Sequence, residues 1–271
     1  MSTSQSAYDY SRYEALRLDK KDGVMTITLS NPGRRNATNP TMSAELTRIW
    51  EDVWLDPEVR VIVLQGDGAD FCAGADASRL GGRFDVANPV FPMTRLAKKH
   101  AYAILDCEKP TIAKVRGAAY GVGVTLALAC DLVYAAPGAK FRDSHVRVGL
   151  VAGDGGVLLW PALGALRRAK EALMLGDPIS AEDAAEIGLI NRVIPDEELD
   201  GYVDGVVQRL LAQPPHALNY TKASLNVALK QMTGAAFETS IAYEAYTFKT
   251  EDFTEATRAH VEKRKPTFRG K

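Results

Sequence analysis

The stretch Val59-Arg60-Val61-Ile62-Val63-Leu64 is followed directly by a glycine-bearing loop that runs from Gly66 to Asp76. A short apolar run that is rich in β-branched residues and bounded by glycine predicts a buried strand. The arrangement recurs at Thr111 to Val115, where a second glycine loop, Gly117 to Gly123, leads into a short apolar helix ending near Cys130. Because strands alternate with helical segments in this way, the sequence predicts an α/β core.

The segments around these strands extend the pattern. Glu14 to Leu18 and Val24 to Leu29 alternate partly on either side of an Asp-Gly pair, which predicts a hairpin. Apolar residues recur at helical spacing over residues 41–54, and residues 93–107 also predict a helix.

The pattern changes in the second half of the chain. Ser180-Ala181-Glu182-Asp183 is a capping box that opens a helix, and the stretch from Leu199 to Arg264 is helical in pattern with almost no strand signal. We therefore expect an α/β core over residues 1–200 and a helical C-terminal region over residues 201–271.

Composition limits the possible partners. The 271 residues include 33 Lys and Arg against 34 Asp and Glu, a formal net charge of −1, which argues against nucleic-acid binding by phosphate neutralisation. No run approaches the roughly 18 apolar residues that a membrane span needs. The first residues lack the basic and apolar regions of a secretion signal, so we expect a cytoplasmic protein that binds neither nucleic acid nor membrane.

Metal binding finds no support in the spacing of the cysteines and histidines. Cys72, Cys107 and Cys130 lack the short spacings of a zinc site or redox pair, and the four histidines are far apart in sequence. We expect free thiols and no metal.

Two features could carry chemistry. The second glycine loop opens a helix, whose first N–H groups have no internal partner and can hold an oxyanion. His145 and Asp154 flank a glycine-rich connection, and an aspartate that accepts from one imidazole nitrogen leaves the other as a base near neutral pH. The spacing alone also fits a surface histidine and a turn aspartate, and we interpret Arg142 and Asp143 as a surface pair.

Six motifs that occur in order along the chain are Asn36-Ala37, Phe71–Asp76, Gly117–Asp131, Gly176–Ala184, Gly188–Val193 and Glu262–Pro266. Together they resemble the crotonase, or enoyl-CoA hydratase/isomerase, superfamily over residues 12–268. The resemblance implies a spiral of ββα units and a helical C-terminal region that builds homotrimers, often paired into hexamers. It also implies an acyl-CoA thioester as substrate, with coenzyme A as part of that substrate and no further cofactor.

The same resemblance assigns roles by position. The backbone N–H groups of Ala75 and Val122 would form the oxyanion hole that stabilises an enolate at the thioester carbonyl. Arg34, Ala73 and Asp76 fall where the family contacts the nucleotide of CoA. Residues 78–97 would shape the acyl pocket.

The catalytic side chains depart from the hydratase pattern. Where hydratases carry two glutamates, this chain has Thr125 and His145. Hydration needs one group to position water and another to handle the proton at the adjacent carbon, and neither residue keeps that carboxylate pair. Hydration or isomerisation of an enoyl-CoA, hydrolytic C–C cleavage and thioester hydrolysis therefore all stay open.

The residues around this position have a parallel of their own. His145, Val151–Gly155 and Trp160-Pro161 resemble the corresponding stretch of 6-oxocamphor hydrolase, a crotonase relative that cleaves a C–C bond in cyclic β-diketones. The resemblance implies that His145 activates water, that Asp154 orients it or acts as a second acid/base, and that Glu244 joins them from the C-terminal helices. It adds a β-dicarbonyl compound to acyl-CoA as a possible substrate.

A catalytically silent fold that binds acyl-CoA is the alternative from another functional class. Loss of both family glutamates motivates it. Such a fold has no reason to hold His145 and Asp154 within about 4 Å of each other, so that distance discriminates between the two.

Overall fold

The structure is a computed structural model that describes residues 8–76 and 91–271. Its strands are β1 (Leu16–Lys21), β2 (Val24–Leu29), β3 (Val61–Gly66), β4 (Thr111–Val115), β5 (Ala118–Tyr120), β6 (Leu132–Ala135), β7 (Lys140–Arg142), β8 (Ile179–Ser180) and β9 (Arg192–Val193). The larger sheet has the order β1-β2-β3-β4-β6-β9, antiparallel between β1 and β2 and parallel thereafter. The smaller sheet has the order β5-β7-β8.

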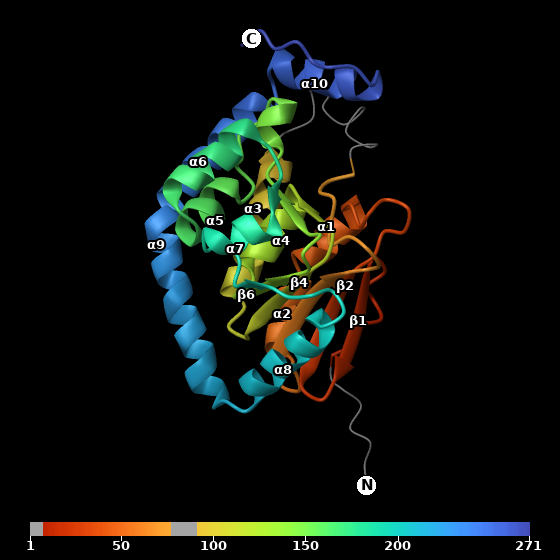
Figure 1. Ribbon diagram of the computed structural model, residues 1–271, viewed down its shortest axis with the longest axis vertical. Coiled ribbons are helices and arrows are strands. Elements are labelled where there is room, and N and C mark those ends of the chain that lie inside the picture. Colours follow the sequence, from red (N-terminus) through yellow and green to blue (C-terminus); the bar gives the residue numbers. More distant parts are fainter. Residues whose placement is uncertain (1–7, 77–90) are drawn as a thin grey trace.

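Helices cover both faces of the larger sheet (Figure 1). The helices are α1 (Pro40–Leu46), α2 (Ile49–Leu55), α3 (Phe91–Asp106), α4 (Val122–Ala129), the 3₁₀-helix η2 (His145–Val148), α5 (Gly156–Leu163), α6 (Leu166–Leu175), α7 (Ala181–Glu186), α8 (Leu199–Leu211), α9 (Pro215–Thr247) and α10 (Glu251–Val261). Helix α8 lies on one face of the larger sheet, and α1 to α4 lie on the other. The long helix α9 runs down one side of the molecule and packs on α3 and α5, and α10 packs on η2 (Figure 1).

The central strand β3 is buried on both faces. Ile62 and Leu64 belong to the larger apolar cluster, which includes α1, α2, α3 and α4, whereas Val61 and Val63 belong to a second cluster with Val203 of α8. A parallel strand that is covered on both faces has no polar side, which is why its sequence reads as a continuous apolar run.

The predicted α/β core followed by a helical C-terminal region is confirmed, and so is the capping box, in which Ser180 Oγ accepts the Asp183 N–H at 3.0 Å. The single helix predicted over residues 41–54 is wrong in one respect. It is broken between α1 and α2, where the Thr47 hydroxyl donates to the Ala44 carbonyl at 2.8 Å. The division at residue 200 stays a prediction.

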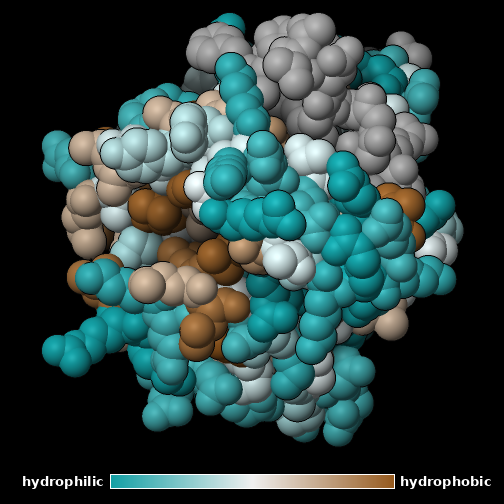
Figure 2. Space-filling view, turned by 90° about the horizontal axis from the view of Figure 1, so that it is seen from above, coloured by the Kyte–Doolittle hydropathy of each residue, from teal (hydrophilic) through white to brown (hydrophobic). Residues whose placement is uncertain are grey.

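Part of the predicted acyl pocket, residues 78–90, lies outside the described residues. Within the described part of the chain, no helix is both long and apolar enough to cross a membrane. Figure 2 shows a patch of hydrophobic side chains within a largely hydrophilic face. Large apolar side chains are also exposed along α9, at Tyr220, Leu225, Val227, Met232, Tyr243 and Tyr246. The expected trimer or hexamer stays a prediction.

Candidate active site

The two glycine loops lie against each other. The Tyr120 N–H donates to the Cys72 carbonyl at 2.9 Å. Gly74, at φ +99°, faces the Tyr120 carbonyl so closely that a Cβ would lie 3.1 Å from its oxygen. This close approach places Ala75 beside the turn that leads into Val122, the first residue of α4.

Two backbone N–H groups at this junction have no partner among the residues that the structure describes. Within residues 8–76 and 91–271, neither the Ala75 N–H nor the Val122 N–H donates a hydrogen bond. The Val122 N–H lies at the positive end of α4, after Gly121 at φ +51°. Unpaired donors of this kind can stabilise a developing oxyanion.

The first glycine loop also runs beside the segment that carries Arg34. The Arg35 carbonyl accepts the Ala73 N–H and the Thr38 carbonyl accepts the Asp76 N–H, each at 3.0 Å. The structure therefore brings together the three positions predicted to contact CoA, Arg34, Ala73 and Asp76, and leaves Arg34 exposed to solvent.

His145 lies among three carboxylates. Its Nδ1 is hydrogen-bonded to Asp143 Oδ1 at 2.7 Å. Its Nε2 is 3.3 Å from Asp154 Oδ1 and 3.8 Å from Glu244 Oε1. The side chains of His145 and Asp154 are each 12% exposed, and that of Glu244 is 4% exposed. The His145–Asp154 distance lies within the limit of about 4 Å set for an interacting pair.

Three segments of the chain supply this cluster, the first of which carries both Asp143 and His145. Asp143 follows β7, His145 begins η2, Asp154 lies in the loop before α5, and Glu244 comes from the C-terminal half of α9. The helical C-terminal region therefore completes a cluster that the α/β core begins.

Glycines allow these segments to approach. A Cβ at Gly153 would clash with the Glu244 carboxylate, and one at Gly156 would clash with Asp143 Oδ2. The loop that carries Asp154 is therefore pressed against α9 on one side and the end of β7 on the other. Side chains at these two positions would push the cluster apart.

Thr125 connects the cluster to the glycine loops. It lies in the first turn of α4, three residues after Val122, and a Cβ at Gly155 would lie 2.8 Å from its Oγ1. The loop that carries Asp154 therefore packs on the same helix end that presents the unpaired Val122 N–H. Among the described residues, Thr125 Oγ1, Asp143 Oδ2, Asp154 Oδ1 and Glu244 Oε2 are buried without a hydrogen-bond partner.

The charges in the cluster shift one another's protonation. Burial lowers the pKa of His145, but the charges of Asp143 and Asp154 outweigh this effect and hold that pKa well above its ordinary value. Burial would raise the pKa of Asp154, yet His145 holds it below its ordinary value. Burial and the charge of Asp154 raise the pKa of Glu244 to about 8. At neutral pH the cluster thus holds an imidazolium, an ionised Asp154 and a protonated Glu244.

The structure brings together His145, Asp154 and Glu244, the three residues predicted to be catalytic, and their catalytic roles stay a prediction. The interpretation of Asp143 as a surface residue is wrong, because its side chain is 1% exposed and bonded to His145, while Arg142 donates to the Gly176 carbonyl. An aspartate two residues before a histidine at a helix start was the available signal.

A second histidine near the cluster also went unrecognised in the sequence. His100 of α3 is buried, with its Nε2 3.0 Å from Ser43 Oγ, and it interacts electrostatically with Asp154. Burial lowers the pKa of His100, so its ring is neutral at neutral pH. It therefore adds no charge to the cluster.

Asp143, His145 and Asp154 carry ligand-type atoms within 4.8 Å of one another, close enough in principle for a metal. Their contacts are those of an ion-pair network, because Asp143 already accepts from Nδ1 and Asp154 faces Nε2. We therefore interpret the cluster as an acid/base group.

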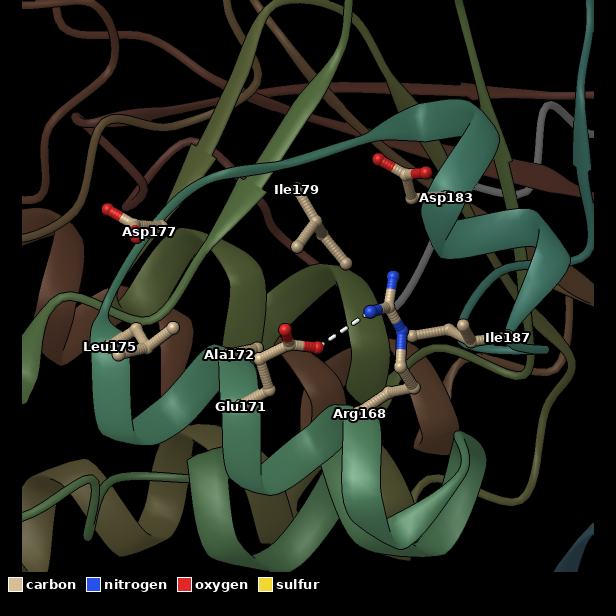
Figure 3. Close-up of a pocket in the computed structure, with 8 residues that line it drawn as sticks. All are labelled: Arg168, Glu171, Ala172, Leu175, Asp177, Ile179, Asp183 and Ile187. Carbon is tan, nitrogen blue, oxygen red and sulfur yellow. Dashed lines mark hydrogen bonds and ion pairs between the residues drawn. The ribbon is translucent and has the colours of Figure 1, made fainter.

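A surface cavity of about 180 Å³ lies elsewhere, between α6, β8 and α7 (Figure 3). Arg168 and Glu171 form an ion pair at 2.6 Å across its floor, and Ile179 points into it from β8. None of its lining residues belongs to the His145 cluster, so the cavity does not mark the site of the chemistry.

Known proteins resemble the chain over nearly its whole length. The family model for enoyl-CoA hydratase/isomerase matches residues 19–271. A 1,2-epoxyphenylacetyl-CoA isomerase from Escherichia coli is 33% identical, covering 92% of this chain and 96% of that protein. A crotonyl-CoA hydratase from Syntrophomonas wolfei is 32% identical, covering 94% and 98%. The crystal structure of an enoyl-CoA hydratase/isomerase from Mycobacterium paratuberculosis superposes with a TM-score of 0.85 at 33% identity, covering 90% and 97%.

Replacement of Gly153 by alanine tests the close approach of α9. We expect Gly153→Ala to lower the free energy of unfolding by about 1–3 kcal/mol, because its methyl group overpacks the contact with Glu244. Gly201→Ala is the matched control, since nothing lies within 4 Å of a Cβ there and alanine favours α8. Urea denaturation measures both, and equal stability of the two variants would contradict the described packing.

The protonation of Glu244 predicts how stability depends on pH. Between its ordinary pKa of 4.5 and about 8, the folded state keeps a proton that the unfolded state has lost. Wild type should therefore lose stability relative to Glu244→Gln as the pH rises through this range, by at most about 1.4 kcal/mol per pH unit. Glu238→Gln, exposed on the same helix, is the control. A pH-independent difference between wild type and Glu244→Gln in denaturation experiments would refute the assignment.

Proposed function

Because this chain belongs to the enoyl-CoA hydratase/isomerase family, we propose that it acts on an acyl-CoA thioester by stabilising an enolate and moving protons at the His145 cluster. The observation that carries the proposal is the convergence of Asp154 and Glu244 on His145 Nε2, at 3.3 and 3.8 Å. The two usual glutamates are absent, but Asp154 and Glu244 supply a pair of carboxyl groups from other positions in the chain.

The backbone N–H groups of Ala75 and Val122 are the proposed oxyanion hole. Both are without a partner among the described residues, and the packing of Gly74 against Tyr120 holds their loops together. Donors that are fixed before the reaction stabilise an enolate oxygen without reorganisation. Arg34, Ala73 and Asp76 are the proposed contacts of the CoA nucleotide, and Arg34 offers an exposed cation for its phosphates.

The protonation states suggest how the roles divide. Asp154 is the ionised group and accepts a proton, while Glu244 and the His145 imidazolium hold protons to give. In hydration, water adds to the β-carbon as Asp154 takes its proton, and the thioester oxygen becomes the enolate oxyanion. The α-carbon then takes a proton from Glu244, which restores the thioester. In isomerisation, the same groups remove a proton from one carbon and return it to another.

Hydrolytic cleavage of a β-dicarbonyl compound is the second candidate. It is favoured by the contact of His145 with both Asp154 and Glu244, which the resemblance to 6-oxocamphor hydrolase implies. Water would attack one carbonyl, its proton would pass to Asp154, and the C–C bond would break to release an enolate into the same oxyanion hole. The enolate carbon would then take a proton from the imidazolium.

A mass-spectrometric assay distinguishes these reactions. Crotonyl-CoA, acetoacetyl-CoA and a cyclic 1,3-diketone are incubated separately with wild type, with His145→Ala and with His216→Ala as the control for loss of an imidazole elsewhere. We expect turnover of a CoA thioester by wild type and by His216→Ala. Turnover should fall by about 10²- to 10⁴-fold in His145→Ala, because a group that moves protons has been removed.

The products identify the reaction. Addition of one water with the thioester intact establishes hydration, and fragmentation of a dicarbonyl establishes the hydrolase. Full activity of His145→Ala would contradict the assignment of the cluster as the site. Binding of the CoA thioesters without conversion of any compound by wild type would favour the silent fold.

A further inference from the structure

We propose that Asp143 is the positioning residue of the site: its carboxylate fixes the His145 ring and keeps a proton on Nδ1, so that Nε2 is the nitrogen that exchanges protons. The geometric part of this inference stands on the structure alone. Its consequence for turnover rests on the proposed function, in which His145 acts on the substrate.

Asp143 holds His145 at two points. Its Oδ1 accepts the backbone N–H of His145 at 3.1 Å and the Nδ1–H of the ring at 2.7 Å. The preceding residue pair, Phe141 and Arg142, lies in β7, where Phe141 is fully buried and pairs with Ala119 of β5. The carboxylate is therefore anchored by a sheet and constrains both the backbone and the ring of its partner.

This contact decides which nitrogen is free to react. An ionised carboxylate only accepts hydrogen bonds, so the ring nitrogen that faces Asp143 must carry a hydrogen in both charge states of His145. The proton that can leave is then the one on Nε2. That nitrogen faces Asp154 at 3.3 Å and Glu244 at 3.8 Å, on the side where the chemistry is proposed.

A purely structural role explains this carboxylate poorly. The Asp143 side chain is 1% exposed, and its Oδ2 has no hydrogen-bond partner among the described residues. Burial of a charge with one oxygen unsatisfied costs stability, and an uncharged group of similar shape avoids that cost. Gly156 nevertheless leaves the space that the carboxylate occupies, since a Cβ there would clash with Oδ2. The hydrogen bond to the His145 imidazole therefore explains why a charged residue occupies this buried position.

The other titratable groups around His145 lie on its opposite side. Asp154 from the loop before α5 and Glu244 from α9 face Nε2, and His100 of α3, which interacts with Asp154, is neutral at neutral pH. Of the contacts described here, Nδ1 has Asp143 alone. A change at residue 143 therefore acts on the Nδ1 side of the ring, whereas changes at the other two carboxyl groups act on the Nε2 side.

The test compares Asp143→Asn with Asp177→Asn. Asp177 pairs with Arg147 of η2 at the surface, so its variant removes a carboxylate that contacts the same short helix without touching His145. Nuclear magnetic resonance of ¹⁵N-labelled histidine follows the His145 ring through a pH titration. We expect Asp143→Asn to lower the pKa of His145, because an opposite charge is lost, and Asp177→Asn to leave it unchanged.

Turnover should change in parallel. We expect kcat of Asp143→Asn to fall by about 10²- to 10⁴-fold with little change in KM, since a misoriented His145 ring still lies in an intact binding site. Its pH profile should shift with the pKa of His145. A merely structural role would lower the amount of folded enzyme without moving that profile.

A measurement on wild type keeps the proposal testable if the variant does not fold. Above the pKa of His145, the ¹⁵N shifts should show hydrogen on Nδ1, and hydrogen on Nε2 would overturn the proposal. An unchanged His145 titration in folded Asp143→Asn would also overturn it. If wild type turns over no acyl-CoA, the proposed function fails, while the tautomer and titration still decide the role of Asp143.

Discussion

The contact of His145 with the neighbouring Asp143 and with carboxyl groups from two other segments is the constraint on which the rest of this structure depends. Taking several charges out of water costs several kcal/mol for each ion unless their geometry compensates. Asp143 at 2.7 Å and Asp154 at 3.3 Å provide that compensation, and the third carboxyl, Glu244, holds a proton instead of a charge at neutral pH. The cluster is therefore stable only while these segments keep their side chains at these distances, and the fold holds the segments in place.

Helix α9 shows how the fold achieves this. Near its start, the Lys222 ammonium pairs with Asp131 at 2.9 Å, next to β6. Near its middle, Phe237 is fully buried and meets Tyr102 of α3 edge to face at 5.2 Å. These two anchors fix the inner face of the helix before it reaches Glu244. Helix α9 belongs to the C-terminal region, yet it places the Glu244 carboxyl group in the buried cluster around His145. The C-terminal region therefore contributes to the proposed chemistry.

The sequence predicts those elements whose burial is visible in a local pattern of apolar residues. The run from Val59 to Leu64 is apolar because β3 is covered on both faces, so its strand was predictable. The strands β7 and β8 have three and two residues, too few to show alternation, and they exist through pairing with distant segments. The burial of Asp143 was unpredictable for the same reason, because it follows directly after β7, a strand that the sequence pattern does not reveal. The cluster of His145, Asp154 and Glu244 was predictable only through resemblance, because no spacing brings residue 244 to residue 145.

Formation of an enolate from a thioester is the central claim, and exchange of hydrogen at the α-carbon tests it most directly. A saturated acyl-CoA, which can be neither hydrated nor cleaved, is incubated in deuterium oxide with wild type, with Asp154→Asn and with the surface variant Asp177→Asn. We predict that wild type and Asp177→Asn introduce deuterium at the α-carbon, as followed by mass spectrometry, and that Asp154→Asn does not. Incorporation at the same rate in Asp154→Asn, or none in wild type while the thioester is bound, would contradict the account.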